Sequence, residues 1–227
     1  KDTDPVFCVT DLLIHLASKQ MDKKAATVVE GENLDILVGS IPVNENEKKS
    51  VKAGVLKILK DKYGMDEEDF FSAELEVVPA GPAREMGFDG SMVMSYGQDD
   101  RVCAYTSLEA ILDSSVNERT SCCLLVDKEE IGSVGATGMQ SRFFENMVAE
   151  LINLNGNYSE LILKRCLKNS KMLSSDVNAA YDPLYADVFS EQSTSYIGKG
   201  VVFNKFTGSR GKSGSNDANA EYLAEIR

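Results

Sequence analysis

The chain has 227 residues, of which 43% are hydrophobic and 26% charged, and its net charge is −12. This length suits one large domain or two smaller ones, and the composition is that of an ordinary globular protein. The negative charge argues against nucleic-acid binding, because phosphate contacts require clustered Lys and Arg. No apolar stretch reaches the roughly 18 residues of a membrane span and the start lacks a signal-peptide pattern, so we expect no membrane partner.

The five cysteines form an odd set without a Cys-x-x-Cys pair: Cys8, Cys103, Cys122, Cys123 and Cys166. Such a set does not build a disulfide framework or a thiolate zinc site. We therefore expect reduced, buried thiols in a cytoplasmic protein.

In the first part of the chain we expect a helix capped by Thr10 or Asp11, a short strand within residues 31–41 and an amphipathic helix over 45–62. Alternating apolar residues predict a half-buried strand over 70–78.

The Pro79–Pro82 segment marks a break, and we place a domain boundary near residue 86. Beyond it, apolar strands, turns and helices alternate, which indicates an α/β fold. The expected helices cover residues 102–112, 140–154, 161–167 and 217–227. The expected strands cover residues 122–126, 171–177 and 198–206, and residues 209–215 read as a mobile loop.

Carboxylates stand at the ends of several apolar runs: Asp99, Asp100, Glu129, Glu130 and Asp176. Crowded carboxylates repel each other unless a cation or shared protons neutralise them, so the set indicates a hydrolytic metal site. Of two adjacent acids, one can bind a metal while the other takes a proton from water. The simpler alternatives are solvated acids at a strand end and helix capping by Asp99 and Asp100.

The chain has a single histidine, His15, which the pattern places on a helix beside Leu12 and Leu16. Taken alone, it reads as a core or interface histidine. One histidine cannot build a His-rich zinc site, and carboxylates alone would also suit Mg or Mn. Residues 208–214 contain Gly-Lys-Ser without the full spacing of a phosphate loop, so we expect no nucleotide there.

Three ordered motifs, over residues 97–108, 127–133 and 174–177, are similar to those of the binuclear zinc aminopeptidase family that contains aspartyl aminopeptidase and vacuolar aminopeptidase I. The resemblance, to a bacterial-type member, extends over nearly the whole chain. It implies a mixed-sheet α/β zinc peptidase domain of the phosphorylase/hydrolase type, interrupted by an inserted dimerisation domain. Residues 1–86 then correspond to part of the insert and residues 87–227 to part of the catalytic domain.

The resemblance also implies roles for individual residues. Asp99 would bridge two zinc ions, Glu130 and Asp176 would each bind one of them, and Glu129 would be the general base. Mn or Co could replace zinc. The activity would be removal of N-terminal residues, acidic or neutral, from peptides. Family members form dimers that assemble into a dodecamer, in which His15 would reach the active site of a neighbouring subunit.

One feature of the family is missing: the sequence lacks the two histidines that complete the zinc ligands. We therefore expect a chain truncated at both ends, which binds zinc weakly and is inactive alone. Two alternatives stay open, namely a non-catalytic assembly or dimerisation module and a related dinuclear metal amidohydrolase.

Overall fold

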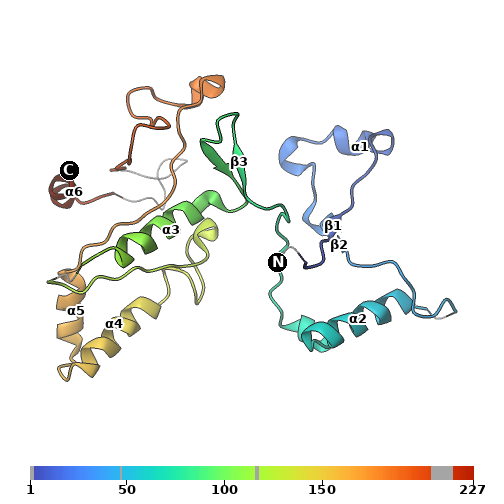
Figure 1. The fold of residues 1–227 in the computed structure, drawn as a ribbon, viewed down its shortest axis with the longest axis horizontal. Helices are drawn as coiled ribbons and strands as arrows, with labels where there is room; N and C mark the ends of the chain where they lie inside the picture. Colours follow the sequence, from blue (N-terminus) through green and yellow to red (C-terminus); the bar gives the residue numbers. More distant parts are fainter. Residues whose placement is uncertain (1–2, 47, 116–117, 206–216) are drawn as a thin grey trace. The chain divides into compact units, whose positions relative to one another are not determined.

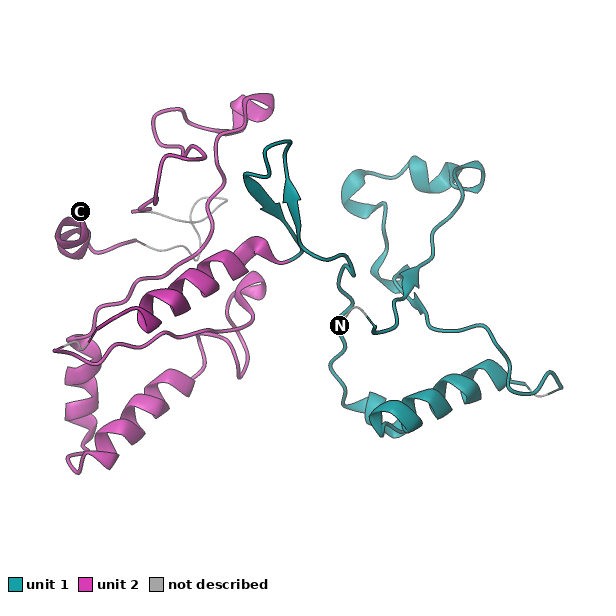
Figure 2. Cartoon of the chain, viewed as in Figure 1, with its two compact units in different colours: residues 1–96 teal, residues 97–227 magenta. Residues whose placement is uncertain are grey.

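The computed structural model describes residues 3–46, 48–115, 118–205 and 217–227. The chain divides into two compact units, Lys1–Tyr96 and Gly97–Arg227 (Figure 2). The sequence pattern placed a boundary near residue 86, so the segment between that point and Tyr96 joins the first unit in the structure. The assignment of the two parts to dimerisation and catalysis stays a prediction.

The first unit opens with two very short strands. β1 (Cys8–Val9) pairs antiparallel with β2 (Ile36–Leu37), and β2 lies within the expected strand range. The chain between them contains short helices: η1 (Ile14–Leu16), α1 (Ser18–Met21), η2 (Ala25–Thr27) and η3 (Gly31–Asn33).

The helix expected from Thr10 or Asp11 begins later, at Ile14. The Asp11 carboxylate accepts hydrogen bonds from the Leu12 N–H at 2.7 Å and from Gln20 Nε2 at 3.1 Å. It therefore ties the loop before η1 to the helix α1 and does not cap a helix, so the capping prediction is wrong.

The amphipathic helix of the first unit is confirmed as α2 (Ser50–Tyr63), which begins a few residues later than expected. It ends at Gly64, whose φ of 69° is the left-handed conformation that glycine adopts without steric cost. The expected strand over 70–78 is wrong. The short helix η4 (Glu67–Phe71) takes its first residues, and the rest joins no sheet in the part of the chain that the structure describes.

A β-hairpin that the sequence pattern did not reveal closes the first unit. β3 (Arg84–Met86) pairs antiparallel with β4 (Met92–Met94), with Arg84 opposite Met94. The connection contains Gly87 and Gly90, both with positive φ, which permits the reversal between such short strands.

The four helices expected in the second unit are confirmed. They are α3 (Gln98–Leu112), α4 (Phe143–Leu154), α5 (Glu160–Lys168) and α6 (Ala220–Ile226). Two begin at side-chain caps, because Ser159 Oγ accepts from the Ile162 N–H and Asn219 Oδ1 from the Tyr222 N–H. Helices α4 and α5 follow each other and pack together (Figure 1). The short helices are η5 (Glu129–Ile131) and η6 (Pro183–Val188).

The strands expected over 122–126 and 171–177 form no ladder among the described residues, so these two predictions are wrong as secondary structure. Residues 198–205 form no strand either, and an isolated bridge joins Ala180 to Ser195. A strand exists only where a neighbouring segment supplies its hydrogen bonds, and periodicity cannot show whether one does. The end of the segment 198–206 and the loop 209–215 lie outside the described residues.

Few apolar side chains of the described chain are buried; those that are belong to Ala17 and Leu163. The five cysteines are free, as expected, but Cys8, Cys122 and Cys166 are exposed, so the expectation of buried thiols is wrong. Among the described residues, no helix or strand packs over these three cysteines and shields them from solvent. None of the described helices is long and apolar enough to cross a membrane.

Candidate metal centre

The carboxylates singled out from the sequence come from three places in the second unit. Asp99 and Asp100 lie in the first turn of α3, Glu129 and Glu130 begin η5, and Asp176 lies in the extended segment after α5.

The start of α3 is irregular at the two aspartates. Gly97 precedes them with a φ of 72°, and the peptide bond between Asp99 and Asp100 is cis. Both aspartates have non-helical backbone angles, so neither extends the regular helix. Partial burial raises the pKa of Asp100, and the negative charges of Asp176 and Asp99 raise it further.

The pKa of Glu129 is also raised, first by partial burial and then by the charges of Asp176, Glu130, Asp99 and Asp100. Carboxylates influence one another in this way only when they lie near each other. The acids that raise the pKa of Glu129 thus come, together with Glu129 itself, from three separate segments, and we call these five residues the carboxylate cluster.

The donor chemistry of the carboxylate cluster suits a divalent cation. Carboxylate oxygens are zinc ligands, and a cation relieves the repulsion that otherwise resists ionisation of Glu129 and Asp100. Within the described residues, no group of three or more His, Cys, Asp or Glu side chains is arranged to hold a metal ion. The residues fit the carboxylate part of a zinc site and leave its ligand set incomplete.

His15 lies in the first unit, on the short helix η1, and its side chain is exposed. The apolar residues around it are exposed as well, with Leu13 70% and Leu16 70% accessible. His15 therefore does not occupy the core position that its place among apolar residues in the sequence suggested.

The segment from Asp127 to Gln140 forms a closed loop around the two glutamates. The Asp127 N–H donates to Thr137 O at 3.1 Å, and Gln140 Nε2 donates to Gly132 O at 2.6 Å. The sequence pattern did not single out Gln140. No sequence motif indicates that its side chain donates a hydrogen bond to the backbone carbonyl of Gly132, eight positions earlier. The sequence pattern also gave Asp100 no role, although its adjacency to Asp99 was visible.

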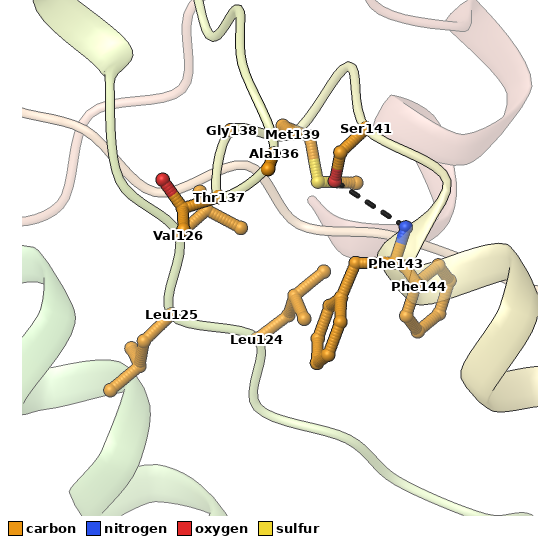
Figure 3. Close-up of a pocket in the computed structure, with 10 residues that line it drawn as sticks. All are labelled: Leu124, Leu125, Val126, Ala136, Thr137, Gly138, Met139, Ser141, Phe143 and Phe144. Atoms are coloured by element: carbon orange, nitrogen blue, oxygen red, sulfur yellow. Dashed lines mark hydrogen bonds between the residues drawn. The ribbon is translucent and has the colours of Figure 1, made fainter. Parts of the chain in front are cut away.

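An apolar pocket lies beside this loop (Figure 3). It is formed by the segment before the loop, the end of the loop and the start of α4. Leu124 points toward Phe143, while Leu125 points to the other side of the chain, as in a strand. The lining residues are Leu124, Leu125, Val126, Ala136, Thr137, Gly138, Met139, Ser141, Phe143 and Phe144.

Comparison with protein families gives a match over the whole chain. The family model described as aminopeptidase I zinc metalloprotease (M18) matches residues 1–227. The chain belongs to the M18 family. The resemblance drawn from the three motifs is thereby confirmed.

Individual relatives agree with this membership. The chain is 62% identical, over its full length, to a probable M18 family aminopeptidase 1 of Clostridium acetobutylicum, and covers 49% of that protein. It is 45% identical to a probable M18 family aminopeptidase 1 of Thermotoga maritima and covers 50% of it. The chain thus spans about half the length of the curated relatives it matches.

Solved structures of the family confirm the fold. The crystal structure of aminopeptidase I from Clostridium acetobutylicum matches the whole chain with a TM-score of 0.84 at 60% identity, and the chain covers 49% of it. The crystal structure of the Thermotoga maritima M18 aminopeptidase matches with a TM-score of 0.90 at 45% identity and 50% coverage. The expected mixed α/β zinc peptidase architecture is that of these M18 structures.

Proposed function

We propose that the protein containing this chain is a zinc aminopeptidase that removes N-terminal residues from peptides. The carboxylate cluster carries this proposal. In this M18 chain, four of these acids come from the three motif segments, and Asp99, Glu130 and Asp176 raise the pKa of Glu129.

Asp99, Glu130 and Asp176 are the residues that would hold zinc, with Asp99 shared between two ions and the other two residues binding one ion each. Mn or Co could occupy the same oxygen ligands. Bound zinc supplies Lewis acidity, which polarises the scissile carbonyl and stabilises negative charge on its oxygen. Because the described residues form an incomplete ligand set, we expect the 227-residue chain by itself to bind zinc weakly and to be inactive.

Glu129 would be the general base. Its carboxylate takes a proton from the attacking water and then delivers that proton to the amine that leaves. Burial and neighbouring negative charge raise its pKa, which makes it a stronger base than an ordinary glutamate. Glu130, next to it in η5, remains available for binding the metal.

The substrates would be peptides with an acidic or a neutral N-terminal residue. The five free cysteines support a reducing compartment, and we place the protein in the cytoplasm. The protein would work as a homo-oligomer of dimers, up to a dodecamer. Exposed apolar side chains of the first unit, among them Leu12 and Ile14, support an interface there.

The decisive test is Glu129→Gln in the full-length protein that contains this chain. We expect loss of kcat by at least about 100-fold, because an amide cannot accept the proton. Zinc content, measured on the same samples by mass spectrometry, should be unchanged. Glu191→Gln is the matched control, since Glu191 is an exposed loop residue outside the carboxylate cluster.

A near-normal kcat in Glu129→Gln would rule out the assignment. Wild-type protein that oligomerises but cleaves no substrate would indicate an assembly module. Cleavage of acylated substrates, with aminoacyl substrates left intact, would indicate an amidohydrolase.

A further inference from the structure

The loop that carries Glu129 and Glu130 is closed by contacts near both of its ends. At one end, the Asp127 N–H donates to Thr137 O at 3.1 Å, and Thr137 Oγ1 donates to the Asp127 carboxylate at 3.3 Å. These paired contacts join the first residue of the loop to its returning segment. The loop therefore has a defined internal structure.

The second closure is made by Gln140. Its side-chain Nε2 donates to Gly132 O at 2.6 Å, and its backbone N–H donates to Ser133 O at 3.1 Å. Gly132 in turn donates its N–H to Glu129 O at 2.8 Å, at the end of η5. A chain of hydrogen bonds thus runs from the Gln140 amide to the turn that holds the glutamates.

The returning segment approaches the turn closely. A Cβ atom on Gly138 would lie 2.2 Å from Ser133 O and 2.5 Å from Ser133 C, which no side chain tolerates. Gly138 is buried at this point, although most of the loop is exposed. Because the backbone at Gly138 lies against Ser133, the Gln140 side chain is near enough to donate to Gly132 O.

The Glu129–Ile131 turn requires stabilising contacts such as the hydrogen bond from Gln140. Lys128 and Ser133, which flank it, have φ values of 69° and 61°, a backbone conformation that non-glycine residues adopt only when their surroundings hold them there. This backbone conformation favours opening of the turn.

We propose that Gln140 is a positioning residue of the aminopeptidase site: its side-chain amide, through Gly132, holds the Glu129–Ile131 turn so that Glu130 faces the metal and Glu129 faces the attacking water. This inference rests on the proposed function. Gln140 acts on the reaction only through the two glutamates and touches neither substrate nor metal.

The test uses two variants of the full-length protein. Gln140→Met keeps the length of the side chain and removes the donor. Gln140→Asn keeps the amide but shortens the side chain by one methylene, so the donor no longer reaches Gly132. We expect each to lower kcat at least 10-fold with KM changed less than 3-fold, and to weaken zinc binding 10- to 100-fold in competition with a chelator. Gln192→Met is the matched control, because Gln192 is exposed in another loop.

The unfolding temperature of the metal-free protein separates positioning from a merely structural role. We expect it to stay within the spread of the Gln192→Met control. Wild-type kcat and zinc affinity in both Gln140 variants would overturn the inference. So would a lowered unfolding temperature with unchanged kcat per folded molecule.

Failure of the inference and failure of the proposed function give different results. An inactive Glu129→Gln variant beside fully active Gln140 variants removes only the role of Gln140. If the wild-type protein cleaves no peptide, the proposed function falls, and the chelator competition still decides whether Gln140 positions Glu130 for metal binding.

Discussion

At the scale of single residues, the proposed chemistry depends on carboxylates whose neighbours oppose their ionisation. Glu129 is the clearest case, because burial and four neighbouring acids all favour its neutral form. An isolated, solvated glutamate at a strand end would keep the ordinary pKa of a glutamate side chain. The crowding supports the proposed role of Glu129 over the alternative of an ordinary solvated pair.

Asp176→Asn tests this crowding in the metal-free 227-residue chain. Asp176 is the charged neighbour with the largest effect on Glu129. Its neutralisation makes ionisation of Glu129 easier, so the pKa of Glu129 should fall toward its ordinary value. The measurement is an NMR titration of the Glu129 side-chain carboxyl carbon.

Asp187→Asn serves as the control, because Asp187 is exposed in η6 and does not contribute to the pKa of Glu129. An unchanged Glu129 titration in Asp176→Asn would show that the two carboxylates do not interact. A fall of equal size in both variants would point to a general effect of net charge.

At the scale of elements, the longer helices were predictable and most strands were not. The helices α2, α3, α4 and α5 follow from the sequence pattern, and the structure adds that Ser159 caps the start of α5. Helix hydrogen bonds close within a few residues, so the signal is local. The expected strand over 122–126 instead depends on a distant partner.

Hydrogen exchange tests the state of residues 122–126. These extended residues have no strand partner in the part of the chain that the structure describes, and Leu125 is 56% exposed. We expect their amides to exchange at nearly unprotected rates, while amides inside α4 exchange more slowly. Strong protection of residues 122–126 would show that a partner segment covers them in this chain.

The same experiment on the full-length protein supplies the comparison. The relatives are about twice as long as this chain, and its fold matches theirs closely. We expect the additional residues to provide both the strand partners and the cover for apolar side chains such as Val126. Protection over 122–126 should therefore appear only in the longer protein.

At the scale of the whole molecule, the chain shows two compact units whose apolar residues are largely exposed. In the first unit the exposed set surrounds His15, since Leu13, Ile14 and Leu16 are each more than half accessible. Apolar residues gathered around a polar side chain are typical of an interface between proteins. This pattern fits the proposal that His15 acts in a neighbouring subunit.

His15→Ala in the full-length protein tests that proposal. We expect kcat/KM to fall about 10-fold or more while the oligomer stays intact in analytical ultracentrifugation, because one polar contact is lost and the apolar interface remains. Lys19→Ala, an exposed change in the following helix α1, is the control. An unchanged kcat/KM would leave His15 with a packing role only.

The sequence by itself determined the family and the longer helices and singled out the candidate site carboxylates, because these depend on local patterns and on motifs that are read along the chain. Only the tertiary structure decided which acids lie near one another, that Gln140 reaches back to Gly132, and that the expected strands lack partners among the described residues. The physical reason is separation along the chain. A helix turn or a cap closes within a few residues, whereas Asp99, Glu129 and Asp176 meet only after intervening elements have folded.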